Sequence, residues 1–137
     1  MPRFLVALAV CVVAGCGGGG GDRESFVSDV NEACRDYRAV VESDPPPETM
    51  DAYTEALEEE IGRWKDADAP DEDREQFEQM IRHQEEGLEH WKAYVVHVEA
   101  DDREKIESAM AQWRKSFVTA AGIADELGLD DCDRALS

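Results

Sequence analysis

The spacing of apolar residues constrains the fold of this chain more than any other feature. From Asp22 onward they recur at intervals of three and four, and no segment of any length alternates between apolar and polar positions as a half-buried strand would. Four segments show this spacing: Phe26, Val30, Cys34, Tyr37, Val41; then Met50, Tyr53, Leu57, Ile61, Trp64; then Phe77, Ile81, Gln84, Leu88, Trp91, Val95, Val98; then Ile106, Met110, Trp113, Phe117, Ala120, Ala124, Leu127. Helices with such a stripe pack along one apolar seam. The sequence therefore predicts an all-α fold, an antiparallel up-down four-helix bundle, as one domain over residues 22–137.

The residues between these segments are typical of helix ends. Prolines occupy the first two loops, Asp101 followed by Glu104 resembles a capping box, and Gly128 with Leu129 after it fits a glycine C-cap. Short loops make neighbouring helices antiparallel, so the fourth helix is expected to end near the start of the first. The small side chains of Ala120, Ala121 and Ala124 suggest room for a close approach of the first helix to the fourth.

The first sixteen residues have the organisation of an export signal. Arg3 gives a positive start, and the apolar run over 4–14 is too short to cross about 30 Å of hydrocarbon as a helix. The run ends in Val13-Ala14-Gly15-Cys16, which resembles the lipobox of bacterial lipoproteins. The resemblance implies that residues 1–15 are a signal peptide cleaved after Gly15, and that Cys16 carries a diacylglyceryl thioether, often with a further acyl chain on its amino group. The alternative is an ordinary secretory signal with an incidental cysteine.

Residues 16–21 are expected to anchor and tether the domain on the extracytoplasmic face of a cell membrane. Two or three acyl chains hold a protein stably without a transmembrane helix, and the five glycines after Cys16 form a flexible tether of at most roughly 17 Å. The formal charge is −19, and cleavage would remove Arg3 as well. Such a surface repels anionic headgroups and nucleic acid. Membrane contact is therefore expected only through Cys16, and nucleic acid is excluded as a partner.

Two of the four cysteines are expected to form a disulfide. Cys11 lies in the discarded segment and Cys16 is used by lipid, which leaves Cys34 and Cys132 in an oxidising compartment. Neither has a second cysteine or histidine close in sequence, so zinc is not expected. The C-terminal tail would have to fold back for Cys132 to reach the first helix. Two free thiols are the alternative.

Several positions together resemble a family of small lipoproteins from high-GC Gram-positive bacteria. They are the cysteine of the first helix, the proline-rich first loop, the Ala-Pro-Asp-Glu-Asp turn at residues 69–73 and the closing Leu-Gly-Leu-Asp-Asp-Cys at residues 127–132. The resemblance implies a helical, disulfide-closed domain. It implies no activity.

His83, His90 and His97 are spaced by seven and include every histidine of the chain. They fall on a row that flanks the core stripe of the third helix, about 10.5 Å apart, too far to share one metal ion. The glutamates of a di-iron bundle are missing three residues before each histidine. We interpret the row as a half-solvated flank, with Glu86 near His83 or His90 and Asp101 near His97 as ion-pair partners.

An acidic stretch runs from Glu58, Glu59 and Glu60 to Glu78. An EF-hand count that starts at Asp66 fails, because Pro70 and Phe77 fall on ligand positions. Helix-start charges and solvated faces explain the stretch more simply, and no metal site is assigned to it.

The tryptophans Trp64, Trp91 and Trp113 lie on core rows, so we predict that they are core residues. Gln84 on a core row and Gly122 inside the fourth helix interrupt the pattern; we attribute Gln84 to a satisfied hydrogen bond and Gly122 to close helix packing, and a polar cavity is the alternative for either. No serine lies in a nucleophile elbow, and no phosphate-binding glycine loop follows a strand.

The function predicted from sequence is a non-enzymatic interaction or structural module of the cell envelope, without a cofactor, that presents a surface to another envelope protein. The alternative is a binding protein for a divalent cation or a small cationic ligand, at the acidic stretch or the histidine row. An enzyme ranks third.

Overall fold

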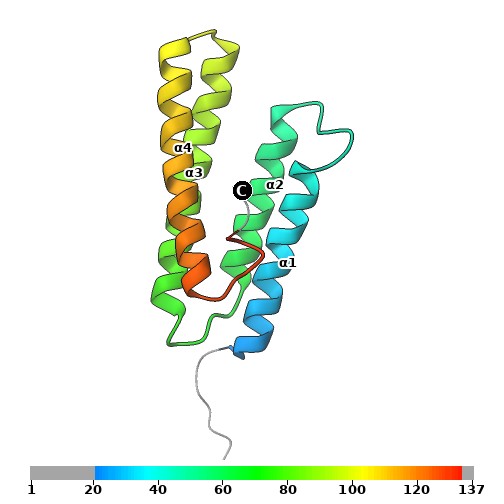
Figure 1. Cartoon of the computed structure of the whole chain (residues 1–137), viewed down its shortest axis with the longest axis vertical. Coiled ribbons are helices and arrows are strands. Elements are labelled where there is room, and N and C mark those ends of the chain that lie inside the picture. Colours follow the sequence, from blue (N-terminus) through cyan, green and yellow to red (C-terminus); the bar gives the residue numbers. More distant parts are fainter. Residues whose placement is uncertain (1–20, 134–137) are drawn as a thin grey trace, which may run out of the picture.

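The computed structural model describes residues 21–133, and this part of the chain is helical throughout its regular elements. Four helices, α1 (Arg23–Val41), α2 (Met50–Asp66), α3 (Arg74–Glu99) and α4 (Arg103–Glu126), form an antiparallel bundle (Figure 1). All four predicted segments are confirmed. The predicted signal peptide, Cys16 and the glycines 17–20 lie outside the described residues.

The bundle consists of two helical hairpins, α1–α2 and α3–α4, which meet along α2 and α3 (Figure 1). On the opposite side, no Cα atom of α1 comes within 8 Å of one in α4. The tail that follows α4 fills this side, and it contributes the buried Leu127, Leu129 and Cys132 to the same core cluster as α1. The expected close approach of α1 to α4 is therefore wrong: buried Ala120 and Ala124 make room for this tail instead.

A glycine-terminated turn sends the tail back along the bundle. Gly128 has a φ of 71°, and the N–H of Leu129 donates to the carbonyl of Ala124 at 2.9 Å, as in a Schellman motif. The Cβ-free residue adopts the left-handed conformation without strain. Arg23 donates to the carbonyl of Leu127 at 3.0 Å, so the end of α4 lies beside the start of α1 as predicted.

The disulfide Cys34–Cys132 joins α1 to this tail, with the two Cα atoms 5.2 Å apart across 98 residues of sequence. The predicted pair is confirmed. Asp131, next to the bridge, is also held by α1: its N–H donates to the side chain of Asn31 at 3.0 Å, and its carboxylate pairs with Arg35 at 2.6 Å.

The cap of α4 is shifted by one residue from the predicted capping box. Asp102 is the N-cap and accepts from the N–H of Lys105 at 3.3 Å. Asp101 instead takes the turn position, with a φ of 52°. Aspartate tolerates a positive φ more readily than most residues do. Asp101 can therefore form the three-residue turn between α3 and α4, and the cap falls to Asp102.

The core does not extend along the full length of α3 and α4. α3 has 26 residues and α2 has 17, so α3 is longer by about 13 Å at 1.5 Å per residue. The end of the α3–α4 hairpin accordingly rises above α1 and α2 (Figure 1). Several predicted core residues of α3 and α4 are therefore not buried: Trp91, Val95, Ile106, Met110 and Trp113 are half-buried, and Val98 is exposed. Val41, also predicted in the core, is the last residue of α1 and is exposed.

The glycine inside α3 and the glycine inside α4 have different surroundings. Gly122 is exposed with open space around it, so close packing does not explain it. Gly87 is buried, and a Cβ there would lie 3.2 Å from the ring of Phe117 in α4. The close contact of α3 with α4 therefore depends on Gly87.

Removal of the disulfide is expected to lower stability substantially. Replacing Cys34 and Cys132 together by Ala frees a loop of 98 residues in the unfolded chain, which the chain-entropy treatment values at about 4–5 kcal/mol. Thermal unfolding followed by circular dichroism should show a lower Tm for the double variant.

Reductant provides the control for this experiment. It should lower the Tm of the wild type and leave that of the double variant unchanged. Equal Tm values in the absence of reductant, or peptide mapping that finds both cysteines alkylated, would contradict the structure.

Candidate functional site

The least expected feature of the interior is a buried carboxyl group. Glu60 of α2 is only 4% exposed, although the sequence analysis placed it in a solvated acidic stretch. That assignment is wrong for this residue, because Glu60 lies next to Ile61 and one turn from Leu57 and Trp64, all three buried. Its neighbours Glu58 and Glu59 are exposed, as predicted.

Gln84 of α3 is the hydrogen-bond partner of Glu60. Its amide Nε2 donates to Oε2 of Glu60 at 3.2 Å, and both side chains are buried. The prediction that Gln84 makes a satisfied hydrogen bond is confirmed. A small cavity of about 10 Å³ is lined by both side chains and by Trp64. The indole Nε1 of Trp64 is buried and has no hydrogen-bond partner.

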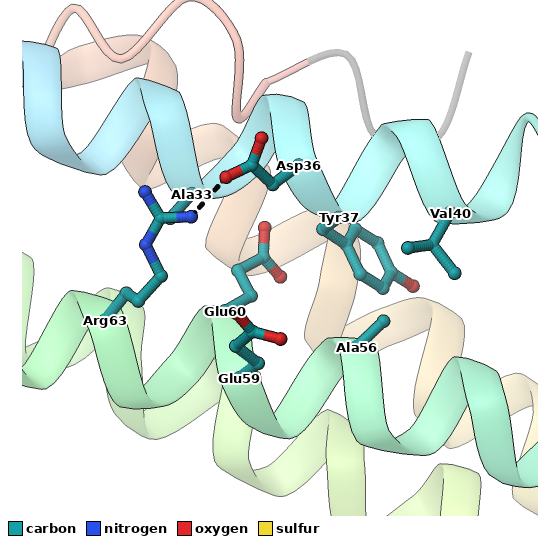
Figure 2. A pocket seen from close by; sticks show the side chains of 8 residues that line it. All are labelled: Ala33, Asp36, Tyr37, Val40, Ala56, Glu59, Glu60 and Arg63. Atoms are coloured by element: carbon teal, nitrogen blue, oxygen red, sulfur yellow. Dashed lines mark hydrogen bonds and ion pairs between the residues drawn. The ribbon is translucent and has the colours of Figure 1, made fainter.

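A larger cavity, of about 90 Å³, opens between α1 and α2 above Glu60. In Figure 2 the carboxyl group of Glu60 points from α2 towards α1, between two different walls. Arg63 reaches from α2 to Asp36 of α1 on one side, and the ring of Tyr37 covers the other. Exposed Glu59 stands at the rim.

Burial sets the proton affinity of this group. Desolvation raises the pKa of Glu60 from 4.5 to about 8, and the hydrogen bond from Gln84 offsets only part of that rise. Arg63 does not neutralise the carboxyl, because its guanidinium pairs with Asp36 and lies 3.7 Å from Glu32. Burial is the main cause that raises the pKa of Tyr37 well above its usual value, and the nearby negative charge of an ionised Glu60 raises it further. At neutral pH the site therefore holds a protonated carboxyl beside a neutral phenol.

The free end of the α3–α4 hairpin is a second candidate site. Trp91 packs on Tyr94 and Trp113 with ring centroids 5.2 and 5.6 Å apart, and its Nε1 donates to Thr54 of α2 at 2.8 Å. Thr54 lies one turn after Met50, the first residue of α2, so this aromatic cluster packs against the first part of that helix. Towards the turn between α3 and α4, half-buried or exposed apolar side chains form what we term the open end: Tyr94, Val95, Val98, Ile106 and Met110.

The histidine row lies where the sequence placed it. His83, His90 and His97 are all half-exposed on α3, and Nδ1 of His83 lies 3.4 Å from Glu86. Within residues 21–133 no cluster of three or more histidine, cysteine or acidic side chains has the geometry of a metal site. Of the tryptophans predicted in the core, only Trp64 is fully buried.

Comparisons with protein families, with curated proteins and with solved structures found no match for this chain. The resemblance to small lipoproteins and the lipobox therefore remain predictions from the residues. None of the described helices combines the length and the apolar composition that crossing a membrane requires.

The burial of Glu60 was not predicted, although the sequence contains a signal for it. Glu60 is three residues after Leu57 and four before Trp64, which places it on the buried face of an amphipathic helix. The spacing of Ile81, Gln84 and Leu88 likewise places Gln84 on the core row of α3. Two polar residues on facing core rows indicate a buried pair.

The stability of the protein should depend on pH through Glu60. Below pH 4.5 both the folded and the unfolded states hold the proton; between 4.5 and 8 only the folded state does, so stability falls as the pH rises through this range. The free energy of unfolding of Glu60→Gln minus that of the wild type should therefore grow by up to about 1.4 kcal/mol per pH unit there. Urea unfolding in amine-free buffers measures it.

Glu55→Gln is the matched control, because Glu55 is an exposed residue of the same helix and the chemical replacement is the same. Its stability should follow the wild type at every pH. A constant difference between Glu60→Gln and the wild type across this range would show that Glu60 does not retain its proton on folding.

Proposed function

We propose that this protein is a lipid-anchored, extracytoplasmic, non-enzymatic interaction module that docks another protein of the cell envelope through the open end of its α3–α4 hairpin. The observation that carries the proposal is the open end itself. Its apolar side chains continue the core rows of α3 and α4 beyond the point where α2 stops.

An apolar stripe on paired helices is stabilised when another surface covers it. The open end has two helices whose mutual orientation is fixed, because the hairpin is joined by a three-residue turn and closed by the Gly87–Phe117 contact. Trp91 and Trp113 form its base and are rigid, amphipathic anchors of the kind enriched at binding hot spots. A docking partner would therefore meet a preorganised surface.

The charge of the chain defines the chemistry of the partner. Glu99, Asp101, Glu104 and Glu107 are exposed in the segment that carries the open end, where they outnumber Arg103 and Lys105, and the chain as a whole is strongly acidic. A second copy would bring like charges together, so we infer a partner with an apolar helical face and lysine or arginine at its edges. Docking of this kind needs no catalytic group.

Membrane association is proposed to depend on Cys16 alone. The acidic domain is repelled by anionic headgroups, and two or three acyl chains are sufficient for stable anchoring. Cys16→Ser should therefore appear in the medium or as an uncleaved precursor. Fractionation with mass spectrometry of the N-terminus checks this, and a Cys16→Ser form that is still cleaved and membrane-bound would overturn the anchor.

Site-specific photocrosslinking in intact cells tests the docking surface. A photoreactive residue at Val98, in the open end, should give one discrete adduct with an envelope protein. The same residue at Val118, which is 61% exposed on α4 outside the open end, is the control and should give none. Met110→Glu should remove the Val98 adduct, because a carboxylate would be desolvated in the apolar contact.

Three results would refute docking at the open end: no adduct from Val98, the same adduct from both positions, or an adduct that Met110→Glu leaves unchanged. An adduct of two copies of the chain would replace the proposed partner with self-association. None of these results bears on the anchor, which the Cys16 experiment tests separately.

A further inference from the structure

We propose that the cavity between α1 and α2 is a binding site for a small primary ammonium ion, with Glu60 as the counter-ion at its base. This site is separate from the open end and does not depend on docking. It rests on three features of the described residues: a buried acid, a cavity that leads to it and an aromatic wall.

The buried acid is only partly satisfied within the protein. Gln84 donates to Oε2 of Glu60, and no other hydrogen bond to this carboxyl is made by the described residues. A carboxylate has two oxygens and about four acceptor positions. Burying such a group without partners is costly, so a cationic donor that reaches the free oxygen would stabilise the folded state.

The cavity has the size and access for a small ligand. Its volume of about 90 Å³ accommodates a few non-hydrogen atoms, since one molecule of liquid water takes about 30 Å³. Its mouth lies between the Arg63–Asp36 pair and Tyr37, so the ligand can enter from the surface (Figure 2). A longer alkyl chain could leave by the same mouth, past the apolar side chains of Val40 and Ala56.

The lining favours an ammonium ion over a metal ion. Divalent cations need several oxygen ligands at 2.0–2.6 Å, and no group of three suitable side chains exists among residues 21–133. An ammonium ion needs fewer fixed ligands: it can donate to Glu60 and rest against the ring of Tyr37, which attracts cations. At the rim, Arg63 and Asp36 pair with each other, and the exposed Glu59 adds a negative charge that favours a positive ligand.

Binding at neutral pH would exchange one proton for the ligand. The protonated carboxyl of Glu60 gives its proton to the solvent buffer, and the resulting carboxylate pairs with the ammonium ion. The charge of the Glu60 carboxylate is then balanced by the positive ligand. Release of about one proton per ligand is a signature that adsorption to exposed acidic residues does not produce, because those residues are already ionised at neutral pH.

Isothermal titration calorimetry of the full chain in non-ionic detergent tests the site, with methylammonium chloride as the probe. Titrations in two buffers of different ionisation enthalpy measure the released proton. The wild type and the surface control Glu55→Gln should bind methylammonium with proton release. Glu60→Gln should weaken binding about tenfold or more, because it removes a charge-assisted hydrogen bond. Folding of that variant is checked by circular dichroism.

Tetramethylammonium, which carries the same charge but has no N–H donor, should bind much more weakly than methylammonium. The proposal is overturned if methylammonium does not bind the wild type, if Glu60→Gln binds it equally well, or if binding releases no proton. It is also overturned if the wild type binds calcium or zinc but not methylammonium, and Glu60→Gln no longer binds that metal ion.

Discussion

The C-terminal tail lies between the two helical hairpins, and its attachment to α1 is the contact on which the closed bundle depends. No Cα atom of α1 lies within 8 Å of one in α4. Apart from α2 and α3, the two hairpins meet directly where Phe26 of α1 packs edge-on against Phe77 of α3, with ring centroids 4.8 Å apart. Leu127, Leu129 and the Cys34–Cys132 bridge supply the missing side of the core. The small side chains of α4 that face this side leave room for the tail. A tail made of consecutive turns, in place of a helix–helix contact, therefore closes this side of the bundle.

This arrangement accounts for both candidate sites. The tail packs with Phe26, Phe77 and Met80 in one core cluster. A second buried cluster of Leu57, Ile61, Leu88 and Phe117 contains no residue of the tail. Between α1 and α2 a cavity of about 90 Å³ remains over Glu60. Above it, the longer α3–α4 hairpin extends beyond its partners. The end of the bundle that contains the tail is therefore buried, and the opposite end exposes apolar side chains.

The buried Glu60 fits a binding role better than a structural one. A hydrophobic side chain of similar volume would stabilise the folded state more, because no desolvation would oppose its burial. The protein instead keeps a carboxyl whose pKa is raised to about 8, held by one amide and facing a cavity. Perturbed ionisable groups in cavities are candidates for functional sites on general grounds.

The sequence alone determined the helices, their approximate ends, the Gly128 turn and the disulfide partners, because these depend on local periodicity, local turn chemistry and the number of remaining cysteines. It also identified Gln84 as a polar residue on a core row. Only the tertiary structure decided which rows are buried along their whole length. Burial depends on the relative lengths of α2 and α3 and on the position of the tail, and neither is encoded in the 3.6-residue repeat of one helix. The exposure of Val98 follows from that arrangement, whereas the burial of Glu60 already follows from its place on the apolar face of α2.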